Sequence, residues 1–320
     1  MGIRFLKKKV FLFLTFGVLS AAPPQQEILA PWLTGPLLQG IPAGASTVSL
    51  YFFATANTGF YNEKWHFSKQ PIFYSINPEL FAVFGLNSWM GFQIIPQLVW
   101  NITQNQSSIN FGDLPTELDI QLVDKCRFVY FPGVKLSLLE TFPTGIYQDL
   151  KPSKLGTDAT GLGTFITEID LTFNKTWLIK PQEHFLNTFI TLGYGLNTPV
   201  DVRGFNVYGG GYGTEGTVRP GNYFLIIFSF EYSFNKQWAF TMDTEYIYTN
   251  KIRFSGDVGV LASGEPAVIA FPSAEQISFT PAIEYNFNDS LGLLAGVWFT
   301  AWGRNTTAFI SGSFNLNYFY

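Results

Sequence analysis

The sequence has little of what metal sites, catalytic triads and water-facing surfaces require. One cysteine and two histidines in 320 residues exclude a disulfide framework and a cysteine-based zinc site, and they leave little for acid–base chemistry. Charged residues make up only 13% of the chain, whereas a typical soluble domain carries about 25%. Beyond residue 22 no uncharged apolar run reaches the roughly 18 residues that a membrane-spanning helix needs, which excludes a helical membrane protein. Much of the apolar surface must therefore face something other than water.

The first 22 residues have the layout of a secretory signal peptide. Arg4 and the three lysines at 7–9 precede an apolar stretch, 10–19, and the small residues Ser20, Ala21 and Ala22 follow it. The alternative is an uncleaved anchor helix, but the stretch is well short of the roughly 20 residues that a span needs. Removal of residues 1–22 leaves 15 basic residues (19 minus 4) against 23 acidic ones, a net charge of −8. An acidic chain without basic clusters argues against nucleic acid as a partner.

The rest of the chain divides into a short lead and one long repetitive region. Residues 23–45 are rich in proline and glycine, which disfavours regular helix or sheet, and we expect them to be a periplasmic or lumenal segment. From residue 46 to 320 the hydropathy alternates with a period of two. In residues 223–234, for example, Phe224, Ile226 and Phe228 alternate with residues such as Ser229 and Glu231. This pattern predicts strands with an apolar face and a more polar one.

The strands and connectors predict an all-β, antiparallel transmembrane barrel. We expect about twelve strands: 46–56, 78–86, 89–102, 116–125, 133–142, 164–174, 185–195, 221–234, 237–249, 275–287, 290–301 and 307–320. Long connectors (57–77, 103–115, 143–163, 196–220 and 250–274) alternate with short ones. Short periplasmic turns and long extracellular loops are typical of bacterial outer-membrane barrels, and an even strand number closes the sheet without an edge.

The opposite orientation of the faces gives the alternative fold, a soluble β-sandwich or lipocalin-like barrel with the apolar face inside. The signal peptide, the shortage of charge and the 18% aromatic content favour the membrane barrel. The last strand supports it, because its alternate residues are apolar or aromatic and end at the C-terminus: Phe314, Leu316, Tyr318 and Tyr320. This ending resembles the C-terminal signal that the barrel-assembly machinery recognises. We therefore expect outer-membrane lipid and that machinery as partners in a Gram-negative bacterium.

Several glycine-rich motifs carry a family resemblance. The segments are 111–114 (FGDL), 133–145 (GVKLSLLETFPTG), 156–164 (GTDATGLGT) and 191–194 (TLGY). Over roughly residues 80–320 the chain resembles the outer-membrane proteins of the MetA-pathway of phenol degradation. The resemblance implies a barrel that passes small, hydrophobic or aromatic compounds. Fatty-acid-transporter barrels are a more distant likeness, since residues 23–45 are too short to form their large N-terminal hatch.

If the apolar faces meet lipid, the opposite faces line the lumen and supply the candidate site. These positions are mostly acidic, with one base: Asp119, Lys135, Glu168, Asp170, Glu231, Asp243, Glu245 and Glu284. Such a lining favours cations over anions in an aqueous pore. Glu231, Asp243 and Glu245 fall on one hairpin, where they could sit side by side and bind a cation. The alternative is that these side chains are solvated, or paired with groups such as Lys135, and hold no specific ligand.

The sequence thus predicts a channel or transporter for small molecules, with loops 143–163, 196–220 and 250–274 narrowing its entrance. The alternative is a non-conducting surface barrel whose long loops bind a host or envelope partner. We expect no catalysis and no cofactor or metal, because His66 and His184 fall on opposite sides of the predicted membrane. The run Gly209–Gly213 follows no strand-to-helix pattern, which favours a loop tip over a phosphate cradle.

Overall fold

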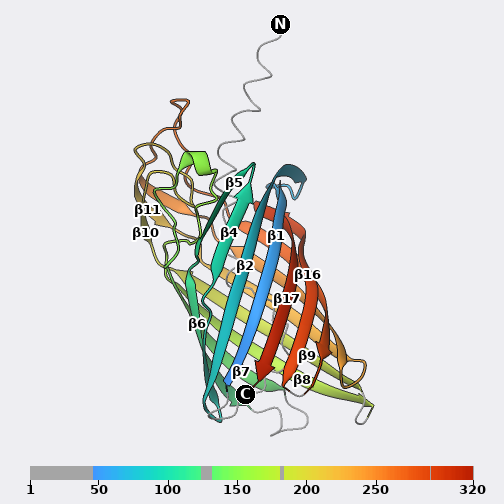
Figure 1. Cartoon of the computed structure of the whole chain (residues 1–320). Helices are drawn as coiled ribbons and strands as arrows, with labels where there is room; N and C mark the ends of the chain where they lie inside the picture. The colour runs from blue at the N-terminus through green and yellow to red at the C-terminus, as the bar shows by residue number, and fades with distance from the viewer. Residues whose placement is uncertain (1–45, 124–131, 181–183, 289, 320) are drawn as a thin grey trace.

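The computed structural model describes residues 46–123, 132–180, 184–288 and 290–319. Fourteen of its strands form one antiparallel sheet that closes on itself, because β1 pairs with β17 on one side and with β2 on the other. Figure 1 shows the resulting barrel, with tilted strands and most of the long connectors gathered at one end. We call this the loop end and the opposite end the turn end. No helix among the described residues has the length and apolar character to cross a membrane.

The strands of the barrel follow one another around the wall in chain order. They are β1 (Ser46–Tyr61), β2 (Phe67–Asn87), β3 (Met90–Ile94), β4 (Leu98–Thr103), β5 (Gln106–Phe111), β6 (Leu114–Val123), β7 (Gly133–Phe142), β8 (Ile166–Lys180), β9 (His184–Asn197), β12 (Tyr223–Ser233), β13 (Trp238–Thr249), β15 (Ala274–Asn286), β16 (Leu291–Arg304) and β17 (Thr306–Phe319). A second sheet of three short strands, β10 (Val200–Arg203), β11 (Glu215–Arg219) and β14 (Arg253–Asp257), is built from two of the long loops.

Two of the barrel's strands are interrupted, so the fourteen strands make twelve crossings of the wall. β3 and β4 both pair with β2, and the break between them contains Pro96. β5 and β6 are separated by Gly112 and Asp113. Hydrogen bonds continue across these breaks, since the Leu80 amide donates to the Pro96 carbonyl and the Gly112 amide to the Gln97 carbonyl. The twelve-strand, all-β barrel predicted from the sequence is therefore confirmed.

Side chains alternate between an outward apolar face and an inward face. In β12, Phe224, Ile226 and Phe228 are exposed on the outside, whereas Leu225 and Ser229 are buried inside. The same alternation runs through β17, where Phe314, Leu316 and Tyr318 point outward and alternate with the buried residues Ser313, Asn315 and Asn317. Tyr320, the last residue of the predicted assembly signal, lies outside the described residues, as do the signal peptide and the segment 23–45.

The connectors differ from the sequence prediction in two places. Segments 143–165, 198–222 and 250–273 are long loops as expected, but 57–77 and 103–115 are mostly strand. β1 and β2 extend over 16 and 21 residues, so that only residues 62–66 join them. β4 passes into β5 through a turn at Gln104 and Asn105, which both have positive φ. Both hairpins carry polar residues here, because strands that extend past an apolar band lose their alternating pattern.

Candidate functional site: the barrel lumen

The inward face of the barrel holds an unusual concentration of buried ionisable groups. Of the predicted lining residues, the structure buries five side chains almost completely: Lys135, Glu168, Asp170, Asp243 and Glu245. Asp119, Glu231 and Glu284 lie on inward positions of their strands but are only partly buried. Because the strands pair in register, these groups fall into separate clusters on neighbouring strands rather than one continuous acidic surface.

Lys135 on β7 is the centre of the first cluster. Its Nζ lies 2.7 Å from Asp119 Oδ1 and 3.6 Å from Glu117 Oε1, both on β6. The Ser137 hydroxyl donates to the same Asp119 oxygen at 2.6 Å, and the Gln93 side-chain amide donates to Glu117. A buried ion pair is costly to break, because removal of one partner leaves the other charge uncompensated. This cluster therefore matches the alternative in which the acids pair with Lys135.

The second cluster contains Glu168 and Asp170 of β8, the strand next to β7. The Tyr223 hydroxyl of β12 donates to Glu168 Oε2, which lies two strands away on β8. The tyrosine can reach across β9 because the position beneath its ring is Gly195, where an added Cβ would lie 2.1 Å from Tyr223 Cζ. Gly193 makes room for Asp170 in the same way, because an added Cβ there would lie 2.3 Å from Asp170 Oδ1. Two glycines on β9 thus let side chains of the flanking strands lie against the wall.

The third cluster is formed by Asp243 and Glu245, which follow one another on the inward face of β13. The Ser278 hydroxyl of β15 donates to Glu245 Oε2 at 3.1 Å, and the Trp298 indole of β16 donates to that hydroxyl at 2.9 Å. Both Asp243 oxygens and Glu245 Oε1 are buried without a hydrogen-bond partner among the described residues. Ser229 lies opposite Asp243 in the β12–β13 pair.

The three acids predicted to sit side by side on this hairpin, Glu231, Asp243 and Glu245, are only partly brought together. Glu231 pairs in register with Thr241, one inward position closer to the turn end than Asp243. Glu284, on β15, accepts a hydrogen bond from the Asn286 side chain at 2.9 Å. Among the described residues no group of three or more His, Cys, Asp and Glu side chains is arranged to hold a metal ion.

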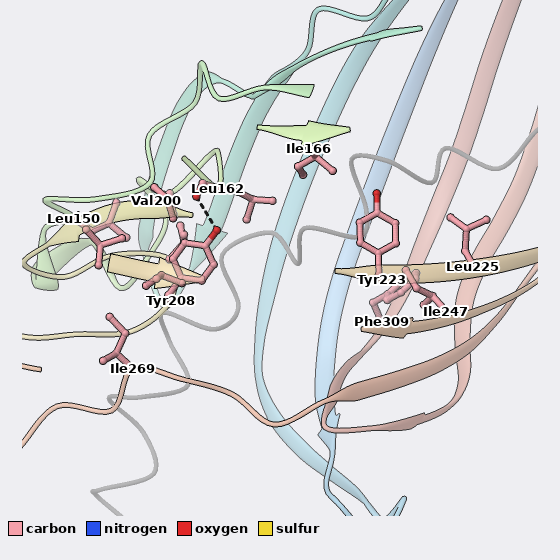
Figure 2. Close-up of a cluster of buried hydrophobic side chains, with 14 of the residues drawn as sticks. Leu150, Leu162, Ile166, Val200, Tyr208, Tyr223, Leu225, Ile247, Ile269 and Phe309 are labelled. Atoms are coloured by element: carbon pink, nitrogen blue, oxygen red, sulfur yellow. Dashed lines mark hydrogen bonds between the residues drawn. The ribbon is translucent and has the colours of Figure 1, made fainter. Parts of the chain in front are cut away.

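Toward the loop end the lumen is apolar, which the sequence prediction of a polar inner face did not include. Inward residues of the barrel, such as Tyr223, Leu225 and Ile247, belong to one buried cluster with loop residues such as Leu162 and Tyr208. Figure 2 shows Tyr208 pointing its hydroxyl at Leu162, whose carbonyl accepts the hydrogen bond at 2.9 Å. The three long loops therefore form a packed cap over this end of the lumen, and we refer to residues 143–165, 198–222 and 250–273 as the cap.

Asp113 fastens the first loop of the cap to the wall. Its Oδ1 accepts a hydrogen bond from the Gly145 amide and its Oδ2 from the Leu162 amide, each at 2.8 Å, and the residue is fully buried. Close packing is required here, because a Cβ on Gly161 would lie 2.3 Å from Asp113 Oδ1. The Thr144 hydroxyl completes the attachment by donating to the Gly112 carbonyl at 2.8 Å.

Three of the four motif segments that carry the family resemblance thus meet at one place. FGDL supplies Asp113, the Pro-Thr-Gly segment supplies Gly145, and GTDATGLGT supplies Leu162. The Asn101 side chain of β4 adds a further link by donating to the carbonyls of Thr157 and Ala159. These short motifs therefore position a loop in the barrel mouth.

The glycine run 209–213 was expected at a loop tip, and this expectation is wrong. Gly210 and Gly211 are buried, and Gly209 pairs with Ile269 in an isolated bridge between two loops. A Cβ on Gly209 would lie 2.1 Å from the Val268 carbonyl oxygen, so the glycines allow the two loops to cross closely. His66, between β1 and β2, and His184, at the start of β9, lie at opposite ends of the barrel. Cys126 lies outside the described residues.

Sequence reasoning missed several residues that shape the lumen. Glu79 of β2 is buried on an inward position, but the next inward residues of that strand, Phe81 and Val83, are apolar, so the pattern does not mark it. Tyr223 and Trp298 were assigned no role, since aromatic residues on an alternating strand are normally expected on the lipid side. Parity places both on the inward face, because Tyr223 shares its face with Ser229 and Trp298 shares its face with Thr300.

Comparison with solved structures places this architecture among outer-membrane barrels. The chain is similar to the COG4313 outer membrane channel from Pseudomonas putida F1, with a TM-score of 0.65, 10% identity, and coverage of 88% of this chain and 97% of that one. It is also similar to the translocator domain of the autotransporter NalP from Neisseria meningitidis, with a TM-score of 0.53, 8% identity, and coverage of 96% and 98%. It has the fold of an outer-membrane β-barrel. No family model matches the chain, and no curated protein matches it.

Proposed function

We propose that the protein is a channel of the bacterial outer membrane, reached after export through a signal peptide, through which small molecules diffuse. The observation that carries the proposal is the contrast between the two faces of a closed wall. Exposed apolar side chains such as Phe228 and Phe314 cover the outside, whereas ionisable side chains such as Lys135, Glu168 and Asp243 line the inside. Lipid favours the first arrangement, and a polar interior is what an aqueous path across a membrane requires.

The cap supports a gated or narrowed entrance within this proposal. Its apolar cluster and the Asp113 attachment hold loop 143–165 against the mouth, so a solute would pass between the cap and the inward faces of the strands. The resemblance to proteins of the MetA-pathway of phenol degradation is the basis for proposing hydrophobic or aromatic solutes. The outward residues Phe314, Leu316 and Tyr318 fit recognition by the barrel-assembly machinery during insertion.

Conductance of the purified protein in a planar bilayer, measured across a salt gradient, tests the proposal. We expect steady single-channel steps with cation preference. The buried inward side chains include several carboxylates but only one positive charge, that of Lys135, among the described residues. Heat-modifiable gel mobility serves as the control for folding. Folded protein without conductance would reject an open pore and favour the alternative of a surface barrel that presents its loops to a partner.

A further inference from the structure

We propose that Asp243 and Glu245, together with Trp298, bind the ammonium group of an amphipathic organic cation inside the barrel. The inference rests on the proposed channel function and names the class of solute that it would accept. It starts from the three carboxylate oxygens of this pair that are buried without a hydrogen-bond partner among the described residues. A buried carboxylate is unfavourable unless a donor or a cation satisfies it, so a positively charged partner would stabilise this pair.

The described residues place no buried lysine or arginine beside this pair. Lys135 is the only buried lysine or arginine among the described residues, and it contacts Asp119 and Glu117. The sequence of 23–45 contains no lysine, arginine or histidine, so its side chains could not supply the charge. A mobile solute is therefore the natural source of the missing positive charge.

The surroundings of the carboxylates favour an organic cation over a metal ion. Glu245 is connected to the Trp298 indole through the Ser278 hydroxyl, and this hydrogen-bonded chain fixes the tryptophan. The Phe309 ring packs edge-on against Trp298 with 4.7 Å between ring centroids. Ammonium groups attached to carbon are recognised by carboxylates combined with aromatic surfaces. A metal ion needs several oxygen or nitrogen ligands, and the described residues hold no cluster of three His, Cys, Asp or Glu ligands for one.

The apolar neighbours lie beside Glu245 and on its loop side. Ile227 pairs in register with Glu245, and Leu225 pairs with Ile247, the next inward residue of β13. All three are buried members of the cluster that includes Trp298 and Phe309. A solute with one ammonium group and one apolar body would thus place its charge at Asp243 and Glu245 and its body toward the cap.

Binding of benzylammonium to the purified mature chain in detergent micelles tests the inference, with isothermal calorimetry and tryptophan fluorescence as readouts. Benzyl alcohol is the neutral control, and potassium ion tests an inorganic cation. We expect saturable benzylammonium binding, at least tenfold weaker binding of benzyl alcohol, and a similar loss in the Asp243→Asn/Glu245→Gln variant. Trp298→Phe should weaken binding without abolishing it. The matched control Glu275→Gln, whose carboxylate pairs with Arg304 outside this cluster, should bind as the wild type does.

Three results would overturn the site: equal binding of benzylammonium and benzyl alcohol, full competition by potassium at equal concentration, or unchanged binding in the double variant. The first two use only the wild-type protein, so they hold even if the variants fail to fold. Conductance measured on the same preparation separates the two proposals. Conductance without benzylammonium binding rejects this site alone, whereas binding without conductance keeps the site and rejects the open channel.

Discussion

Asp113 Oδ2 accepts a hydrogen bond from the Leu162 backbone amide at 2.8 Å, across 49 residues of sequence. Its other oxygen binds the Gly145 amide, so one fully buried carboxylate holds both ends of loop 143–165. A carboxylate suits this position because it only accepts hydrogen bonds and can satisfy two amides at once. The relationship makes Asp113 the residue on which the position of the loop depends.

Substitution Asp113→Asn should release loop 143–165 while leaving the barrel closed. The amide supplies one oxygen instead of two, so one backbone amide loses a charge-assisted hydrogen bond worth about 1.5–3 kcal/mol. Lys154 lies in this loop and provides a natural trypsin site, whereas the Lys151–Pro152 bond resists trypsin. We expect trypsin to cut there roughly 10- to 100-fold faster, if opening precedes cleavage. Asp201→Asn, on the exposed strand β10, is the control and should leave cleavage unchanged.

Substitution Lys135→Met should destabilise the barrel by about 3–5 kcal/mol, because it leaves Glu117 and Asp119 buried without a counter-charge. Urea unfolding of the protein in lipid vesicles measures the change. If the variant also carries Glu117→Gln and Asp119→Asn, most of the loss should be recovered, since coupled residues are not additive. Equal stability of the single and triple variants would contradict the coupling. Lys175→Met, which removes an outward lysine lying over Trp177, should cost less than about 1 kcal/mol.

The cap should loosen at alkaline pH because of Tyr208. Burial raises the pKa of the Tyr208 hydroxyl above its ordinary value of 10.0. Between the two pKa values the opened loop loses this proton while the packed loop keeps it, so the packed form becomes less favoured as pH rises above about 10. Below that pH the hydroxyl keeps its hydrogen bond to Leu162.

Proteolysis by proteinase K between pH 8 and 11 measures this dependence. Tyr208→Phe should be cut somewhat faster at pH 8, because it lacks a hydrogen bond worth about 0.5–1.5 kcal/mol, and its rate should rise less with pH. The control is Tyr212→Phe in the same loop, where the side chain is 55% exposed, and this variant should be cut as the wild type is. If the cleavage rate of the wild type rises with pH no more steeply than that of Tyr208→Phe, Tyr208 does not have this role.

The orientation of the wall can be checked at Phe228, an exposed outward residue near the middle of β12. If this face meets lipid, Phe228→Arg should destabilise the folded barrel by about 2–4 kcal/mol, with the larger value expected near the bilayer centre. Phe228→Leu keeps the apolar character and should be close to the wild type. Urea titration in vesicles gives both values, and similar stability of the two variants would argue against lipid at this position.

Periodicity predicted the wall well, because β12, β13 and β15 have one side against an apolar environment and the other against polar groups. It failed for 57–77 and 103–115, where the strands continue with residues such as Ser68 and Ser107 that face no apolar environment. It also missed the apolar upper lumen: Leu225 and Ile227 meet cap residues far away in sequence, which alternation cannot reveal. The contacts of Asp113 with Gly145 and Leu162 also join residues far apart in sequence, so alternation along one strand cannot predict them.

The absence of side chains at Gly193 and Gly195 has a consequence for solute size. On most strands an inward side chain projects toward the barrel axis and takes up cross-section. At these two positions the Asp170 carboxylate and the Tyr223 ring fill the space above the glycines. The internal width of the barrel at this height therefore depends partly on which strand carries glycine at its inward positions, and not on the number of strands alone. Alanine at either glycine would displace its neighbour toward the axis and reduce the largest solute that could pass.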